Sequence, residues 1–154
     1  MNEKELKIIQ KLIEVEKTIG DLYKVYSEKF PEYSQFWKET SNEEAVHAGF
    51  LITLGSQMND KTEYFDAKGF NLAALDTMIN YIKEKIRTAG DGNESALSAL
   101  SIALDIERSL IESKFYESFR GESHELKTTI EKIIADTKRH REQIQALRDK
   151  QKNK

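Results

Sequence analysis

Apolar residues recur at spacings of three and four along almost the whole chain, and alternation with a period of two is hard to find. This spacing is typical of amphipathic helices, because residues three and four apart lie on one helix face. Breakers are scarce, with one proline and seven glycines in 154 residues. The sequence therefore predicts an all-α protein of long helices, large enough for one domain with its own core.

Four long helices and one shorter helix follow from the apolar stripes and the turn signals. The long helices are expected at about Glu3–Phe30, Pro31–Gly55, Asn93–Arg120 and Ser123–Leu147. Pro31 suits a first helical turn, and Asn93 is a good N-cap. A shorter helix is expected to start at Asn71 or Asp76. Residues 148–154 form a polar tail, which we expect to fray.

The lengths of the connections predict how the helices are arranged. Short links join the first long helix to the second and the third to the fourth, which makes two antiparallel hairpins. A connection of roughly 35 residues separates the hairpins, and its helix of roughly 19 residues can cover about 28 Å. The second and third long helices are therefore expected to run parallel. Glu107 follows Glu16 by 91 residues, and His140 follows His47 by 93 residues. These nearly equal offsets indicate two hairpins of similar design.

Five charged or ionisable residues occupy apolar-stripe positions near the middles of the helices. They are Glu16, Glu44, His47, Glu107 and His140. Such groups are seldom buried unless they are paired or bound to metal, because each isolated buried ion costs several kcal/mol. Glu44 and His47 stand three residues apart, on one helix face. Carboxylate and imidazole ligands together suit iron, manganese or zinc.

By these positions the chain resembles the rubrerythrins and other ferritin-like di-iron carboxylate proteins, over roughly residues 5 to 147. In that family two helices each give a glutamate, and two others each give a glutamate-x-x-histidine pair. The resemblance implies a ferritin-like four-helix bundle over residues 1–147, with one long crossover connection that carries the short extra helix. It also implies two iron sites, with manganese or zinc as alternatives. Tyr23 matches a tyrosine near the metals, with a catalytic role through a hydrogen bond to a ligand.

The chain departs from the family pattern at Thr137, where a bridging glutamate is expected three residues before His140. The resemblance leaves one metal with Glu16, Glu44 and His47, and the second, weakened site with Glu107, His140 and a shared Glu44. Water or an exogenous anion could take the vacant bridge. Asp136 is an alternative ligand, although a solvated aspartate on the helix flank is favoured.

Two further residues near this pattern are expected to have no part in metal binding. Thr137 is expected to pack or to bond to a helix carbonyl. Lys114 lies two turns after Glu107, and we expect it to reach water at the bundle end rather than a core carboxylate.

Composition excludes several classes of function. The net charge of −3 offers no basic field for nucleic acid or membrane surfaces. The absence of cysteine excludes disulfides, thiolate metal sites and a rubredoxin-like module, so an enzyme would need a separate electron donor. No apolar run is long enough for a membrane span, and no signal peptide is visible, which predicts a cytoplasmic protein. A homodimer is the expected assembly.

Three functions remain open at this point. The first is a non-haem di-iron oxidoreductase acting on peroxide or ferrous iron. The second is a metal-binding module with little catalysis, which the missing carboxylate at Thr137 favours. The third is a structural protein whose core polar groups pair with each other and hold no metal.

Overall fold

The computed structural model describes residues 2–58 and 63–154, and almost all of this chain is helical. The five α-helices are α1 (Glu3–Lys29), α2 (Ser34–Gln57), α3 (Leu72–Gly90), α4 (Ala96–Ser113) and α5 (His124–Lys152). Two 3-10 helices, η1 (Pro31–Tyr33) and η2 (Phe115–Ser118), and two short strands, β1 (Glu63–Phe65) and β2 (Phe119–Gly121), complete the described elements.

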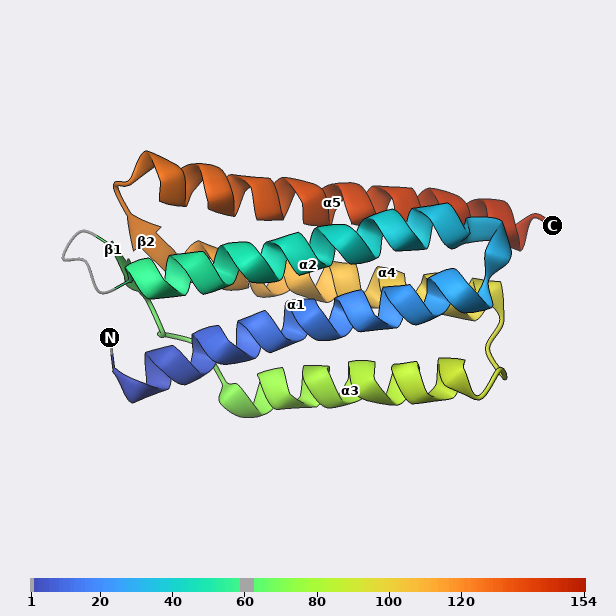
Figure 1. Ribbon diagram of the computed structural model, residues 1–154, viewed down its shortest axis with the longest axis horizontal. Coiled ribbons are helices and arrows are strands. Elements are labelled where there is room, and N and C mark those ends of the chain that lie inside the picture. The colour runs from blue at the N-terminus through green and yellow to red at the C-terminus, as the bar shows by residue number, and fades with distance from the viewer. Residues whose placement is uncertain (1, 59–62) are drawn as a thin grey trace.

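The helices form a four-helix bundle with one crossover, as predicted (Figure 1). The α1–α2 pair and the α4–α5 pair are antiparallel hairpins, and α2 and α4 run in the same direction. The crossover helix α3 packs against α1, and its Leu75, Ile79 and Ile82 belong to the same buried apolar core. No helix in the described part of the chain is long and apolar enough to cross a membrane.

The helix starts follow local capping chemistry. Asn71 begins α3, the earlier of the two predicted starts, because its side chain accepts a hydrogen bond from the amide of Ala73. Ser123 caps α5 in the same way, as expected. The prediction for α4 is wrong in detail, because Ser95 and not Asn93 accepts the bond that opens the helix.

The helix ends differ more from prediction. Lys114 takes a left-handed backbone conformation with φ 55°, so α4 ends at Ser113 and not near Arg120. The chain then forms η2 and the strand β2, which pairs antiparallel with β1. This ribbon was not predicted, because strands of three residues leave no periodicity to read. At the C-terminus the expected fraying is wrong, since α5 continues to Lys152.

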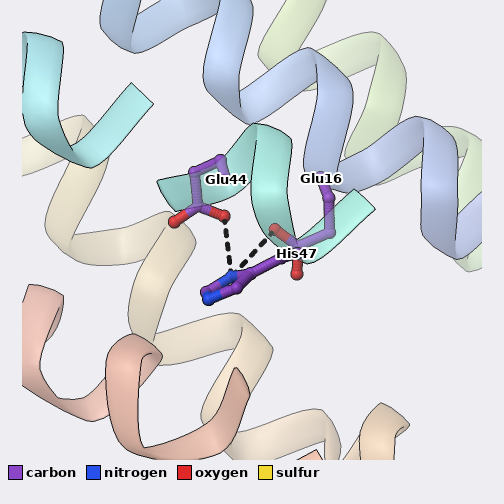
Figure 2. A group of neighbouring side chains, drawn as sticks. All are labelled: Glu16, Glu44 and His47. Atoms are coloured by element: carbon purple, nitrogen blue, oxygen red, sulfur yellow. Dashed lines mark ion pairs between the residues drawn. The ribbon is translucent and has the colours of Figure 1, made fainter. Parts of the chain in front are cut away.

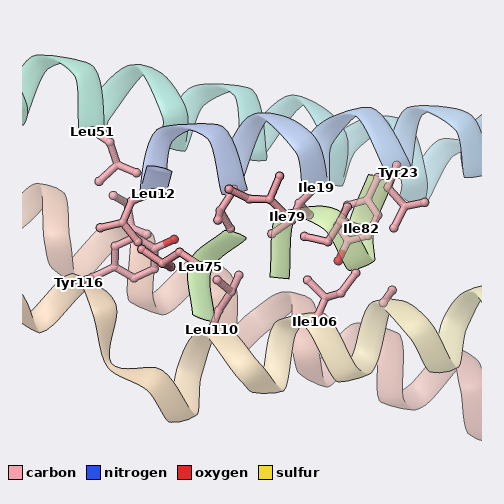
Figure 3. Close-up of a cluster of buried hydrophobic side chains, with 14 of the residues drawn as sticks. Leu12, Ile19, Tyr23, Leu51, Leu75, Ile79, Ile82, Ile106, Leu110 and Tyr116 are labelled. Carbon is pink, nitrogen blue, oxygen red and sulfur yellow. The ribbon is translucent and has the colours of Figure 1, made fainter. Parts of the chain in front are cut away.

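A continuous apolar core runs along the bundle and fixes the helices around its centre (Figure 3). Leu12 and Ile19 of α1 belong to one buried cluster with Leu75 of α3 and with Ile106 and Leu110 of α4. Burial of each such side chain contributes about 1.5–3 kcal/mol relative to exposure. Trp37, the only tryptophan, is fully buried and packs 5.2 Å from the ring of Tyr23 and 5.0 Å from the ring of Tyr26. These three aromatic residues are therefore part of the core.

Candidate metal centre

Helices α1 and α2 approach each other closely at Gly20, near the centre of the bundle. A Cβ atom there would lie 3.4 Å from the carbonyl oxygen of Ser41 and 3.5 Å from the Cβ of Glu44, so the position has little room for a side chain. The hydroxyl of Ser41 donates a hydrogen bond of 2.7 Å to the Gly20 carbonyl. This contact holds Glu44 of α2 within reach of Glu16, which lies one turn before Gly20 on α1.

A first group of candidate metal ligands, formed by Glu16, Glu44 and His47, joins these two helices (Figure 2). Nδ1 of His47 lies 3.7 Å from Glu44 Oε2 and 3.9 Å from Glu16 Oε2. All three side chains are buried, with at most 1 % of their surface exposed. Their ligand atoms lie within 4.8 Å of one another. Two ligands that each lie about 2.1 Å from one ion are at most about 4.2 Å apart, so a small contraction would place them around a metal.

A second group lies beside the first and contains Glu44, Glu107 and His140. Nδ1 of His140 lies 2.9 Å from Glu44 Oε1 and 3.5 Å from Glu107 Oε1. Glu44 therefore presents one carboxylate oxygen to each histidine and belongs to both groups. The structure thus brings all five predicted residues together, in the two sets expected. Their binding of metal stays a prediction.

The unpaired polar atoms of the centre suggest what these residues hold. In the described residues, six buried side-chain atoms of the five candidate ligands have no hydrogen-bond partner. They are Glu16 Oε2, Glu44 Oε1 and Oε2, His47 Nδ1, Glu107 Oε2 and His140 Nδ1. Even the 2.9 Å approach of His140 to Glu44 lacks hydrogen-bond geometry. Buried polar groups are rarely left in this state, and these atoms would gain partners from cations placed between them.

Two tyrosines hold the outer glutamates. The hydroxyl of Tyr23 donates a hydrogen bond of 2.8 Å to Glu107 Oε1, so Tyr23 contacts one of the candidate ligands. The hydroxyl of Tyr116 in η2 donates in the same way to Glu16 Oε1. Sequence reasoning missed Tyr116, because it treated α4 as continuous past Lys114. Each bond occupies one oxygen of its carboxylate and leaves the other free for the centre.

The outer nitrogens of the two histidines also have acidic partners. Nε2 of His47 donates to Asp136 Oδ2 at 2.8 Å, and Nε2 of His140 donates to Glu43 Oε2 at 2.7 Å. These bonds keep a proton on Nε2, so Nδ1 is the nitrogen that faces the centre and would bind a metal ion after losing its own proton. The expected solvated position of Asp136 is wrong, because the residue is only 3 % exposed. Nor does it join either ligand group.

Charged residues at the surface complete this arrangement. Lys132 lies 2.6 Å and Arg139 lies 3.0 Å from Asp136 Oδ1, and Arg139 also pairs with Glu43. Burial alone would raise the pKa of Asp136, but His47 and Lys132 lower it to about 2. The aspartate is therefore a stable anion at neutral pH and can orient His47. Glu43 was not identified from the sequence, where a glutamate before Glu44 looks like an ordinary surface residue.

At the departure from the family pattern, the prediction of a packing role is confirmed. Thr137 is 2 % exposed, and its hydroxyl donates a hydrogen bond of 2.8 Å to the carbonyl of Ile133. Lys114 is exposed at the end of α4, as expected, and pairs with no carboxylate in the described residues. The bridging position is therefore filled by no carboxylate of α5.

Without metal, the crowded acidic groups change the pKa values of the centre. Burial and the neighbouring Glu16 raise the pKa of Glu44 to about 8. Burial lowers the pKa of His47, but its contacts with Glu16 and Glu44 outweigh this and raise it to about 11. The pKa of His140 rises to about 10, because Glu107 and Glu44 outweigh the effect of burial. The metal-free centre therefore holds protons where cations would otherwise balance the charge.

Fold and site together define a ferritin-like bundle with two adjacent carboxylate–histidine groups, the arrangement of di-metal carboxylate proteins. The model of the rubrerythrin family matches residues 7–148. The chain belongs to the rubrerythrin family, and the resemblance drawn from its residues is confirmed. No match was found among curated proteins or among solved structures.

Replacement of Tyr116 by phenylalanine tests the contact that sequence reasoning missed. We expect Tyr116→Phe to weaken metal binding by about tenfold, since loss of a partner that orients a ligand costs 10–100-fold in affinity. The fold should persist, because only one hydroxyl is removed. Competition with a chelator measures the affinity, and Tyr81→Phe is the control, since Tyr81 is 40 % exposed and lies outside the centre. Equal affinities of Tyr116→Phe and the wild type would show that the bond to Glu16 does not orient the ligand.

Proposed function

We propose that this protein binds two metal ions at the centre, iron in the first instance, and acts as an oxidoreductase on peroxide or ferrous iron. The observation that supports the proposal is the convergence of unpaired buried atoms from five candidate ligands. Each ion would have a histidine and an outer glutamate of its own, and would share Glu44. When bound, a pair of ferrous ions supplies the two electrons that reduction of a peroxide requires.

The contribution of the protein is to position and shield these groups. Asp136 and Glu43 fix the histidine rings, while Tyr23 and Tyr116 fix the outer carboxylates. The apolar core excludes water from the centre, which strengthens electrostatic interactions there. Since the chain has no cysteine, the proposal includes a separate electron donor. A cytoplasmic location and a homodimer belong to the same proposal.

A second candidate function is metal binding with little catalysis. Thr137 favours it, because no carboxylate of α5 stands in the position of a second bridge between the two groups, and such a bridge influences the distance between the ions and their redox behaviour. The third candidate, a structural protein without metal, is disfavoured because the histidine–glutamate contacts of the centre leave six buried atoms of the candidate ligands without a hydrogen-bond partner in the described residues.

Anaerobic reconstitution with ferrous iron tests the proposal. We expect about two iron ions per chain and oxidation of both on addition of hydrogen peroxide, because one peroxide accepts two electrons. Elemental analysis gives the stoichiometry, and iron absorbance after rapid mixing gives the rate. Two bound ions without peroxide-dependent oxidation would support the binding module. Fewer than two ions, together with no oxidation, would contradict the proposed function.

A further inference from the structure

Helices α2 and α5 lie side by side, and polar contacts join them at the level of the metal centre (Figure 1). Nε2 of His47 in α2 donates to Asp136 of α5. Nε2 of His140 in α5 donates in turn to Glu43 of α2, and Arg139 of α5 pairs with both acidic residues. We call these five residues the α2–α5 seam. Because water competes for charged groups near the surface, the seam can open at a lower cost than the apolar core.

Glu43 is the exposed member of the groups that hold the candidate ligands. In the described residues, four side chains outside the ligand set form hydrogen bonds with it, namely Tyr23, Tyr116, Asp136 and Glu43. Both tyrosines are buried, and the side chain of Asp136 is 5 % exposed, whereas that of Glu43 is 37 % exposed. Glu43 therefore connects solvent to His140 through one hydrogen bond of 2.7 Å. On its inner side, His140 presents Nδ1, which has no hydrogen-bond partner in this part of the chain.

Arg139 is a cation that already binds between the two carboxylates of the seam. Its Nη1 lies 3.0 Å from Asp136 Oδ1, and its Nη2 pairs with Glu43 Oε2. Lys132 lies 2.6 Å from Asp136 Oδ1, so two positive charges balance the two carboxylates. The side chain of Arg139 is 42 % exposed, and an ion pair at this exposure stabilises only weakly. When Arg139 turns outward, the carboxylates exceed the cations by one charge and attract a metal ion.

We propose that Glu43 is the first ligand of a metal ion on its way into the centre, and that Arg139 competes with the ion for this carboxylate. The inference rests on the proposed function, since it assumes a centre that binds metal. Glu43 holds the ion at the surface, beside the ring of His140, before the ion passes between α2 and α5 to the unpaired ligand atoms. This role goes beyond orientation of the histidine ring, because it depends on the negative charge of Glu43 and not only on its hydrogen bond.

The test uses cobalt(II) as the probe and the fluorescence of Trp37 as the signal, so the measurement does not depend on activity. Trp37 is the only tryptophan, is fully buried and packs 5.2 Å from Tyr23, which bonds to the candidate ligand Glu107. Cobalt(II) quenches the fluorescence of a nearby indole when it binds. Rapid mixing of metal-free protein with excess cobalt(II) gives the uptake rate, and addition of EDTA to the loaded protein gives the release rate. Elemental analysis gives the number of bound ions.

Glu43→Gln keeps an oxygen for the proton of His140 Nε2 but loses the charge. We expect uptake to slow roughly tenfold and release to change less than about twofold, since electrostatic attraction acts on association. Glu43→Asp keeps the charge and should recover most of the uptake rate. Glu39→Gln removes the same charge one turn earlier, at an exposed position on α2, and should leave both rates unchanged.

Arg139→Gln should have the opposite effect and speed uptake several-fold, because Glu43 then has no competing cation in the seam. Lys132→Gln is the matched control, since it removes an equal charge from α5 but pairs only with Asp136. A general change in the electric field would accelerate both variants equally, and this result would contradict a specific role of Arg139. Asp136→Asn, at the buried partner of His47, should act through faster release and not through slower uptake.

The outcomes separate this inference from the proposed function. If the wild type binds two cobalt ions and Glu43→Gln takes them up equally fast, the inference is wrong and the metal centre stands. A loss of affinity that appears only in the release rate would also overturn it, because Glu43 then only orients His140. One bound ion whose uptake depends on Glu43 would support the inference and contradict the second metal site. No bound cobalt in the wild type would overturn both. If circular dichroism shows that Glu43→Gln does not fold, Arg139→Gln and Lys132→Gln provide the test.

Discussion

Glu44→Gln is expected to abolish binding of both metal ions and, at the same time, to stabilise the metal-free protein. Glu44 presents one oxygen to each of the two ligand groups, so its loss affects both sites. Glutamine has the same shape but no charge, and it offers one oxygen where the carboxylate offers two. We expect metal affinity to fall by roughly 100-fold or more, since loss of a ligand costs at least as much as loss of its supporting partners.

Metal affinity falls in this variant, but the stability of the metal-free protein rises. The reason is that the buried Glu44 carboxylate is unfavourable when no metal is bound. Its pKa is raised to about 8 by burial and by the nearby Glu16, so a neutral side chain suits the site better than a carboxylate. We expect the melting temperature of the metal-free variant to exceed that of the metal-free wild type by several degrees, about 1–2 kcal/mol. Such a trade-off is typical of residues kept for function.

Chelator-treated protein and metal-loaded protein should be compared by thermal unfolding and elemental analysis. Glu39→Gln, at an exposed position on the same helix, is the matched control and should change neither quantity. If Glu44→Gln binds two metals like the wild type, Glu44 is not the shared ligand. If instead it destabilises the metal-free protein, the carboxylate is paired within the core, as the structural hypothesis requires.

The bundle and the five candidate ligands could be predicted because both follow from one periodic pattern. A glutamate or histidine in an apolar stripe faces the core by geometry, whatever its partners are. Glu16 and Glu107, with His47 and His140, also repeat between the hairpins, so each position supports the other. The gap at Thr137 was visible from the family resemblance, which implies a glutamate three residues before His140.

The partners of these ligands were harder to predict, because they depend on where the helices end. Tyr116 can reach Glu16 because α4 ends before Lys114 and η2 turns the chain inward. A left-handed lysine is not foreseeable from helix propensity, which does not disfavour lysine. Asp136 lies on the flank of its stripe, and whether a flank faces solvent depends on the packing of the neighbouring helix. Its bond to His47 of α2 is a tertiary contact with no local sequence pattern.

The stability of the metal-free protein is expected to fall as the pH rises from about 5 to 10. Glu44 has an ordinary pKa of 4.5 that is raised to about 8, so the folded state keeps a proton that the unfolded chain releases. His47 and His140 have an ordinary pKa of 6.5, raised to about 11 and about 10. Their stabilisation is complete below pH 6.5 and is lost as the pH rises through the folded pKa values. Each such group lowers the free energy of unfolding by at most about 1.4 kcal/mol per pH unit.

All three groups act in the same direction between pH 6.5 and 8, so the decline should be steepest there. The metal-loaded protein should behave differently, because its ligands are already deprotonated and metal binding no longer competes with protons at high pH. Urea unfolding at pH 6, 7 and 8, with chelator or with zinc, measures both curves. We expect the stabilisation by zinc to grow with pH. Metal-free stability that rises over this range would mean that the buried histidines are neutral in the folded state, and the electrostatic description of the centre would then be wrong.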